Sequence, residues 1–259
     1  MEYNPDLLPI IKTIDEHFEI PQLIRTRRIT ALLPWNYHET DKRYPVLYLQ
    51  DGQNLFDDYA PFGSWGVNKK LAALSGEGKG DVIIIAIDHA ESDRIAEFTP
   101  TAQTKLGSGD GKKYARFLAE TLKPFVDENF RTLPERKHTG IGGSSMGGLV
   151  SVYATLQYPH VYRKLMIFSP SFWVTPNMPR RFIYENPDFN GEVYLYCGTN
   201  EGSNLVEYLN AFEQAADENP HDNDISVKVN IKEGGEHNEY AWGEAFSDAL
   251  EWLFYRNKN

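Results

Sequence analysis

The sequence has very little cysteine, since Cys197 is the only one in 259 residues. An intrachain disulfide is therefore impossible, and no second thiol or histidine-rich cluster lies near Cys197 to complete a zinc site. Cys197 stands in the apolar run EVYLYCG, where a lone cysteine typically packs as a small hydrophobic residue. We expect no disulfide scaffold and no metal centre.

Clusters of basic residues are also missing. The chain has 26 Lys and Arg against 37 Asp and Glu, which gives a net charge of −11. The sequence shows no basic stretch that would follow a phosphate backbone or an anionic lipid surface. Nucleic acid and membranes are therefore not expected as partners.

Long hydrophobic runs are absent as well. No apolar stretch approaches the length of a membrane span, and the start MEYNPDLLPI lacks the basic and apolar regions of a secretory signal. No repeat, low-complexity tract or long linker divides the chain. These features predict a soluble cytoplasmic protein with a single domain over residues 1–259, and they say nothing of its oligomeric state.

What the sequence does contain is an alternation of strand-like and helix-like segments. One half-exposed alternating run comes first, at 24–34. Nearly continuous apolar runs, typical of strands buried on both faces, follow at 44–50, 81–88, 164–169 and 192–197, and a last strand-like run lies at 225–233. Helical patterns cover 68–75, 112–130, 146–158, 204–218 and 240–256. This order predicts an α/β fold with a mainly parallel, doubly wound sheet, helices on both faces, and ligand sites beyond the carboxyl ends of the strands.

The segment TGIGGSSMGGLV, residues 139–150, lies where a strand-like stretch passes into a helical one. A dinucleotide fingerprint would need glycine where Ser145 stands, and a phosphate-binding loop would need Gly-Lys-Ser/Thr where the chain has Gly147-Gly148-Leu149. Gly143, Ser145 and Gly147 instead match GxSxG, in which small neighbours permit a sharp turn that exposes the serine hydroxyl. The pattern predicts Ser145, and not Ser144, as a nucleophile.

A serine nucleophile needs a base and an acid that orients the base, in the chain order Ser, Asp/Glu, His for this kind of fold. His237 follows the last strand-like run and is therefore expected at the same sheet edge as Ser145, whereas His221 precedes that run. Glu201 is the only carboxylate of the loop GTNEGSN, and Asp222 and Asp224 lie at the wrong strand end. We predict a Ser145–His237–Glu201 triad.

Two backbone amides are expected to form the oxyanion hole of such a site. Met146 supplies one because it follows the nucleophile directly. The turn at Asp51–Gly52, in LYLQDGQNLFDD, supplies the second through the amide of Gln53 or, as the alternative, of Asn54.

Several longer segments together resemble one known family. These are RYPVLYLQDGQNLFD, FLAETLKPFVDENFRT, GIGGSSMGGLVSVYATLQYPHVYRKLMIFSPSFW, the GTNE loop and GGEHNEYAW, in order and without large gaps from about Ile24 onward. They are similar to the putative esterase family of the α/β-hydrolase superfamily, whose relatives include feruloyl and acetylxylan esterases, enterochelin-type siderophore esterases, S-formylglutathione hydrolases and mycolyltransferases.

The resemblance implies an α/β-hydrolase fold, a serine esterase mechanism without metal or organic cofactor, and a small-molecule ester as substrate. It places the nucleophile on Ser145, the acid on Glu201, the histidine on His237 and the oxyanion amides on Gln53 and Met146. Many members have Asp where Glu201 stands. It also suggests Trp173 in PSFW, and Trp65 in FGSWGVNKK, as substrate contacts, although either could simply pack in the fold.

The segment between the strand-like runs at 164–169 and 192–197 is short for a lid, so we expect an open site for small or sugar-linked esters. Acyl transfer with the same triad, hydrolysis of a siderophore ester, and a non-catalytic binding module of the same fold are the alternatives. The complete set of triad residues disfavours the binding module.

Overall fold

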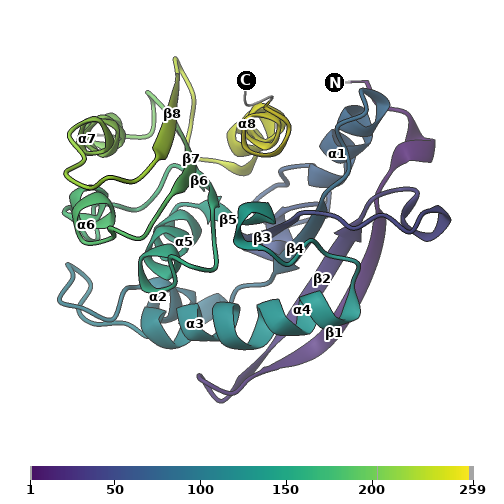
Figure 1. Cartoon of the computed structure of the whole chain (residues 1–259), viewed down its shortest axis with the longest axis horizontal. Coiled ribbons are helices and arrows are strands. Elements are labelled where there is room, and N and C mark those ends of the chain that lie inside the picture. The colour runs from purple at the N-terminus through teal and green to yellow at the C-terminus, as the bar shows by residue number, and fades with distance from the viewer. Residues whose placement is uncertain (1, 203, 257–259) are drawn as a thin grey trace.

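The structure is a computed structural model that describes residues 2–202 and 204–256, and an eight-stranded sheet forms its centre (Figure 1). The strand order is β1-β2-β4-β3-β5-β6-β7-β8. β1 and β2 pair antiparallel with each other, β2 pairs antiparallel with β4, and the strands from β4 through β3 to β8 are parallel. The strands span Ile10–Ile20 (β1), Arg25–Leu33 (β2), Val46–Gln50 (β3), Ile83–Ile87 (β4), Thr139–Ser144 (β5), Lys164–Phe168 (β6), Gly191–Gly198 (β7) and Ile225–Lys232 (β8).

Helices cover both faces of this sheet. The side chains of α1 and α8 pack into one hydrophobic cluster, and those of α3 to α7 pack into a second cluster on the opposite face (Figure 1). The helices are Val67–Gly76 (α1), Arg94–Phe98 (α2), Gly111–Phe117 (α3), Lys123–Asn129 (α4), Met146–Gln157 (α5), Met178–Tyr184 (α6), Leu205–Asp217 (α7) and Glu239–Leu250 (α8). The doubly wound, mainly parallel α/β arrangement expected from the sequence is thus confirmed.

The buried strands follow from their composition. Every residue of β3, β4 and β7 is buried, in agreement with their nearly continuous apolar runs. The helical pattern at 112–130 forms α3 and α4 joined by a π-helical turn at Leu118–Leu122, and a second π-helical turn, Glu251–Tyr255, extends α8.

Strand β1 is the main element that the sequence patterns do not predict. Its sequence, IIKTIDEHFEI, is largely polar, because it pairs only with β2 at the sheet edge and most of its side chains are solvent-exposed. Its register against β2 also shifts twice, between Thr13 and Asp15 and between Asp15 and Phe18. An exposed, irregular edge strand has neither an apolar run nor a regular alternation to mark it.

The parallel register brings together five loops at the carboxyl ends of the strands. Ser144 at the end of β5 pairs with Phe168 at the end of β6, and Phe168 pairs with Tyr196 near the end of β7. The loops that follow β3, β5, β6, β7 and β8 therefore lie together, and they contain the residues proposed from the sequence.

Candidate active site

Ser145 occupies the sharp turn between β5 and α5. Its φ and ψ are 54° and −121°, a conformation that non-glycine residues rarely adopt. The turn is held because the Ser145 amide donates to the Phe168 carbonyl at 2.9 Å and the Ser171 amide donates to the Ser145 carbonyl at 3.0 Å. Such strain is characteristic of functional positions that the surrounding structure fixes.

The two glycines of GxSxG are required by close contacts. A Cβ atom on Gly147 would lie 2.8 Å from Asp51 Oδ2 and 3.0 Å from Gln50 Cβ. A Cβ atom on Gly143 would lie 3.0 Å from the Gly147 carbonyl carbon. The strand-to-helix turn can therefore pack against the end of β3 only with glycine at both positions.

Glu201 and His237 meet at the ends of β7 and β8. His237 Nδ1 lies 2.8 Å from Glu201 Oε2, and the Glu201 side chain is fully buried whereas that of His237 is 40% exposed. The Glu201 Oε1 atom accepts from the Ser169 hydroxyl at 2.8 Å and from the Gly198 amide. Because Nδ1 of His237 is hydrogen-bonded to the Glu201 carboxylate, Nε2 is the ring nitrogen that remains for another hydrogen-bond partner.

Trp242 packs against His237 and is connected to Glu201 through Ser169. Its indole nitrogen donates to the Ser169 hydroxyl at 2.8 Å, and its ring packs edge-on against the His237 ring with centroids 4.9 Å apart. Ser169, itself at φ 44°, thus connects the Glu201 carboxylate to Trp242. Neither Ser169 nor Trp242 is marked by a sequence motif, although both lie in segments that carry the family resemblance.

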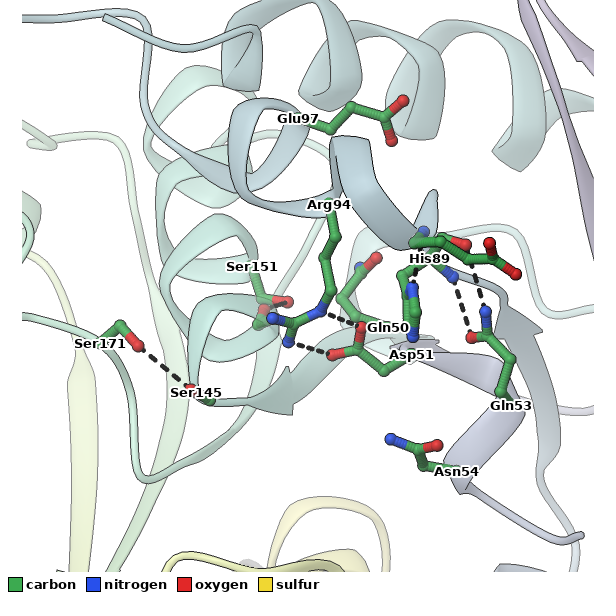
Figure 2. A network of polar contacts seen from close by, with 12 residues as sticks. Gln50, Asp51, Gln53, Asn54, His89, Arg94, Glu97, Ser145, Ser151 and Ser171 are labelled. Carbon is green, nitrogen blue, oxygen red and sulfur yellow. Dashed lines mark hydrogen bonds and ion pairs between the residues drawn. The ribbon is translucent and has the colours of Figure 1, made fainter. Parts of the chain in front are cut away.

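Ser145 and His237 line the same two cavities. One, of about 680 Å³, also contains Asp51, Gln53 and Glu239, and the other, of about 260 Å³, also contains Ser171, Trp173 and Glu201. The Ser145 hydroxyl makes a hydrogen bond with the Ser171 hydroxyl, at 3.2 Å (Figure 2). Sequence patterns alone did not single out Ser171.

The loop after β3 approaches Ser145 from the other side. Asp51 has φ 59°, and its carboxylate accepts two hydrogen bonds from Arg94, at 2.6 Å from Nε and 2.8 Å from Nη2 (Figure 2). The Asn54 amide donates to the Asp51 carbonyl at 2.9 Å, so it is used inside the turn. The Gln53 side chain is held by the backbone of His89, to which it donates at 3.1 Å and from which it accepts at 2.9 Å.

The first-turn position of Met146 leaves its amide without a partner inside α5. This amide and that of Gln53 are the two donors that the sequence suggested for an oxyanion. The amide of Asn54, the alternative to Gln53, is engaged with the Asp51 carbonyl.

The two tryptophans suggested by the resemblance lie in different environments. Trp173 is 49% exposed and lines the smaller cavity beside Ser145 and His237. Trp65 is 3% exposed, and its ring stacks on that of Phe168 with centroids 5.2 Å apart. Trp65 lines neither of the two cavities beside Ser145. The structure thus corrects the expectation for Trp65, which is a core residue.

The residues rejected on topological grounds lie apart from this edge. His221 Nε2 contacts the Tyr184 carbonyl at 2.9 Å, and the Asp224 carbonyl accepts from the Gly191 amide at the start of β7. Asp222 is next to His221 in the same loop, which precedes β8. All three therefore lie at the amino ends of the parallel strands, whereas Ser145 lies at their carboxyl ends.

Comparison with known proteins agrees with this geometry. The model of the family described as putative esterase matches residues 20–253. The chain belongs to this family. It is accordingly an ester-hydrolysing enzyme.

Individual relatives are distant in sequence. The uncharacterized protein YbbA of Bacillus subtilis is 25% identical over 246 residues, which cover 90% of this chain and 94% of the relative. A ferulic acid esterase of Anaeromyces mucronatus superposes with a TM-score of 0.71 at 20% identity, covering 97% and 93% of the two chains. An enterobactin and salmochelin hydrolase gives a TM-score of 0.71 at 18% identity and covers 95% of each chain. The two structural likenesses establish the α/β-hydrolase fold of the chain.

Among residues 2–202 and 204–256, no helix combines the length and the apolar character needed to cross a bilayer. Within the same ranges, no three His, Cys, Asp or Glu side chains are grouped as a metal ion would require.

Proposed function

We propose that this protein is a serine carboxylic-ester hydrolase in which Ser145 is the nucleophile, His237 the base and Glu201 the acid that orients His237. The observation that carries the proposal is the hydrogen bond between His237 Nδ1 and the buried Glu201 carboxylate, in the cavities that the strained Ser145 also lines. A histidine fixed in this way presents Nε2 to accept a proton.

In the proposed reaction, the Ser145 hydroxyl turns from Ser171 toward His237. His237 Nε2 takes the hydroxyl proton while Ser145 Oγ bonds to the ester carbonyl carbon. The amides of Gln53 and Met146 donate hydrogen bonds to the oxyanion that forms. Hydrogen bonds between catalytic groups are often long or misdirected before substrate binds, so the present Ser145–Ser171 contact is compatible with this step.

The tetrahedral intermediate then collapses and its carbon–oxygen bond to the alcohol breaks. The leaving alkoxide takes the proton from His237, and the acyl group stays on Ser145 as an ester. His237 then deprotonates a water molecule, whose oxygen bonds to the acyl carbon. The bond from this carbon to Ser145 Oγ breaks, Ser145 Oγ takes the proton from His237, and the acid is released. In this proposal the catalytic groups are all side chains and backbone amides of the chain, and water is the second nucleophile.

Small or sugar-linked esters are the proposed substrates, and Trp173 is proposed to contact one arm of the ester. Support comes from the exposure of His237 and Trp173 at the cavities and from relatives named as feruloyl and siderophore esterases. Hydrolysis of a panel of short acyl, feruloyl, acetyl-sugar and trilactone esters would test the class. Peptide mass mapping after fluorophosphonate labelling should locate the label on Ser145; labelling elsewhere, or no hydrolysis of any ester, would refute the proposal.

A further inference from the structure

The lining of the larger cavity beside Ser145 has a net negative charge. Its lining includes three carboxylates, those of Asp51, Glu91 and Glu239, and one guanidinium, that of Arg94, so its formal charge is −2 with neutral histidines. Apolar side chains, including Phe62 and Ile95, complete the lining and are 73% and 47% exposed. A substrate arm in this cavity thus meets apolar surface and net negative charge.

Arg94 is poorly available to bind an anionic substrate. Two of its nitrogens, Nε and Nη2, hold the two oxygens of Asp51 at 2.6 and 2.8 Å, and the side chains of Arg94 and Asp51 are 21% and 7% exposed. A bidentate pair of this kind offsets the charge of both partners. The remaining charge of the cavity is that of Glu91 and Glu239.

Of these two acids, Glu239 lies in the environment where its charge acts more strongly. Glu91 is exposed to solvent, which screens it, whereas Glu239 is half-buried. Burial, and then the proximity of Asp51, raise the pKa of the Glu239 carboxyl. Its Oε1 atom accepts from the Asn54 side chain at 3.1 Å, which fixes the carboxylate at the start of α8, two residues after His237.

Resting on the proposed function of Ser145, we infer that Glu239 is a specificity-determining residue that makes the enzyme select esters without a negative charge on the arm seated in the larger cavity. An anionic arm in this cavity would be repelled by a carboxylate that low local solvation leaves poorly screened. The favoured substrate arm carries no negative charge and presents apolar surface to Phe62 and Ile95.

Matched chromogenic esters can measure this selection. For the acyl arm, mono(4-nitrophenyl) glutarate is compared with 4-nitrophenyl valerate, which has a methyl group in place of the carboxylate. For the alcohol arm, 3-butyryloxy-4-nitrobenzoic acid is compared with 2-nitrophenyl butyrate, which lacks only the carboxylate, and each kcat/KM is divided by the rate constant for hydroxide hydrolysis of the same ester. The ratio of anionic to neutral substrate removes any general effect of a substitution on His237.

The variant Glu239→Gln tests the role of the charge at pH 8, since glutamine can still accept from Asn54. Its matched control is Glu244→Gln on the same helix, which also removes one negative charge; the Glu244 side chain is 57% exposed and pairs with Lys70 outside this cavity. In wild type, the anionic-to-neutral ratio should be below one for at least one arm. Glu239→Gln should raise that ratio about threefold to tenfold, and Glu244→Gln should leave it unchanged.

Salt provides a second measurement, because about 1 M NaCl shortens the electrostatic screening length to about 3 Å. The anionic-to-neutral ratio of the wild-type enzyme should therefore move closer to one in high salt. A wild-type ratio of one or more for both arms would overturn the inference. So would a ratio that Glu239→Gln leaves unchanged for both arms, or that Glu244→Gln raises equally. These outcomes differ from failure of the proposed function, in which the neutral esters themselves are not hydrolysed.

Discussion

His237 Nδ1 and Glu201 Oε2 lie 2.8 Å apart although 36 positions separate the two residues in the chain. The contact forms because β7 and β8 are parallel neighbours, so that the loops after them open at the same edge. A buried carboxylate that contacts a partly exposed imidazole can fix its tautomer and stabilise its protonated form.

Replacing Ser145 by Ala should lower ester hydrolysis by about 10³-fold or more, since the nucleophilic oxygen is removed. Ser144→Ala is the matched control and should retain most of the activity, because Ser144 lies in β5 before the strained turn. Initial rates with 4-nitrophenyl butyrate, together with circular dichroism to verify folding, provide the comparison. If Ser144→Ala loses activity and Ser145→Ala does not, the nucleophile is Ser144 and the assignment of Ser145 is wrong.

Glu201→Gln should reduce kcat by about 10²- to 10⁴-fold, because the amide stabilises the protonated His237 less well and can favour the wrong tautomer. Fluorophosphonate should still reach Ser145 in this variant, although more slowly. Asp222→Asn and Asp224→Asn, at the opposite sheet edge, should change kcat by less than about twofold. A large loss in either aspartate variant, with Glu201→Gln active, would transfer the acid to the other loop.

Gly147→Ala should destabilise the protein by about 1–3 kcal/mol, because the new methyl group overlaps atoms of Asp51 and Gln50 that have little room to move. Gly76→Ala is the control: a Cβ atom there would have its nearest contact at 3.8 Å, at the exposed end of α1. Its effect should stay within about 0.5 kcal/mol. Urea unfolding followed by tryptophan fluorescence measures both, and equal stability of the two variants would contradict the packing argument.

These contacts show which parts of the site the sequence could predict. Ser145 was predictable because GxSxG is local, and Glu201 and His237 were predictable because their order and their positions after strand-like runs reflect the topology of a parallel sheet. Their 2.8 Å contact follows from strand pairing, which the buried apolar runs largely determine.

Other features depend on side-chain contacts that no local pattern records. Arg94 and Asp51 are 43 positions apart, and Trp242 and Ser169 are 73 apart, so neither pair forms a motif. Trp65 was suggested as a substrate contact by the family resemblance, but whether its ring faces solvent or stacks on Phe168 depends on contacts between distant segments of the chain. Long-range packing therefore decides what the sequence leaves open.

The stability of the protein should fall on acidification partly through His89. Burial lowers the pKa of His89, and its Nδ1 atom accepts from the Glu91 amide at 2.9 Å, a bond that protonation would remove. The unfolded chain therefore takes up the proton first as the pH falls through about 6.5, so it binds more protons than the native state and stability decreases.

Urea unfolding between pH 8 and pH 5 measures this effect. His89→Gln should show a shallower loss of unfolding free energy than wild type, and His17→Gln, on the exposed edge strand β1, should follow the wild-type curve. An unchanged slope in His89→Gln would show that His89 does not carry this linkage.

The last prediction concerns the base and the absence of any metal requirement in the proposed chemistry. Because His237 must be neutral to accept the Ser145 proton, kcat/KM should fall on acidification, and His237→Ala should lose nearly all activity while remaining folded. A metal-dependent hydrolase can show a similar pH dependence, since metal-bound water also titrates near neutrality, and the pH curve alone does not distinguish the two. Dialysis against EDTA makes the distinction: the rate should be unchanged after chelation and unaffected by added Zn²⁺, Mg²⁺ or Mn²⁺ at micromolar concentration. Activity that disappears in EDTA and returns with one of these ions would rule out the serine mechanism, whatever the geometry around Ser145 suggests.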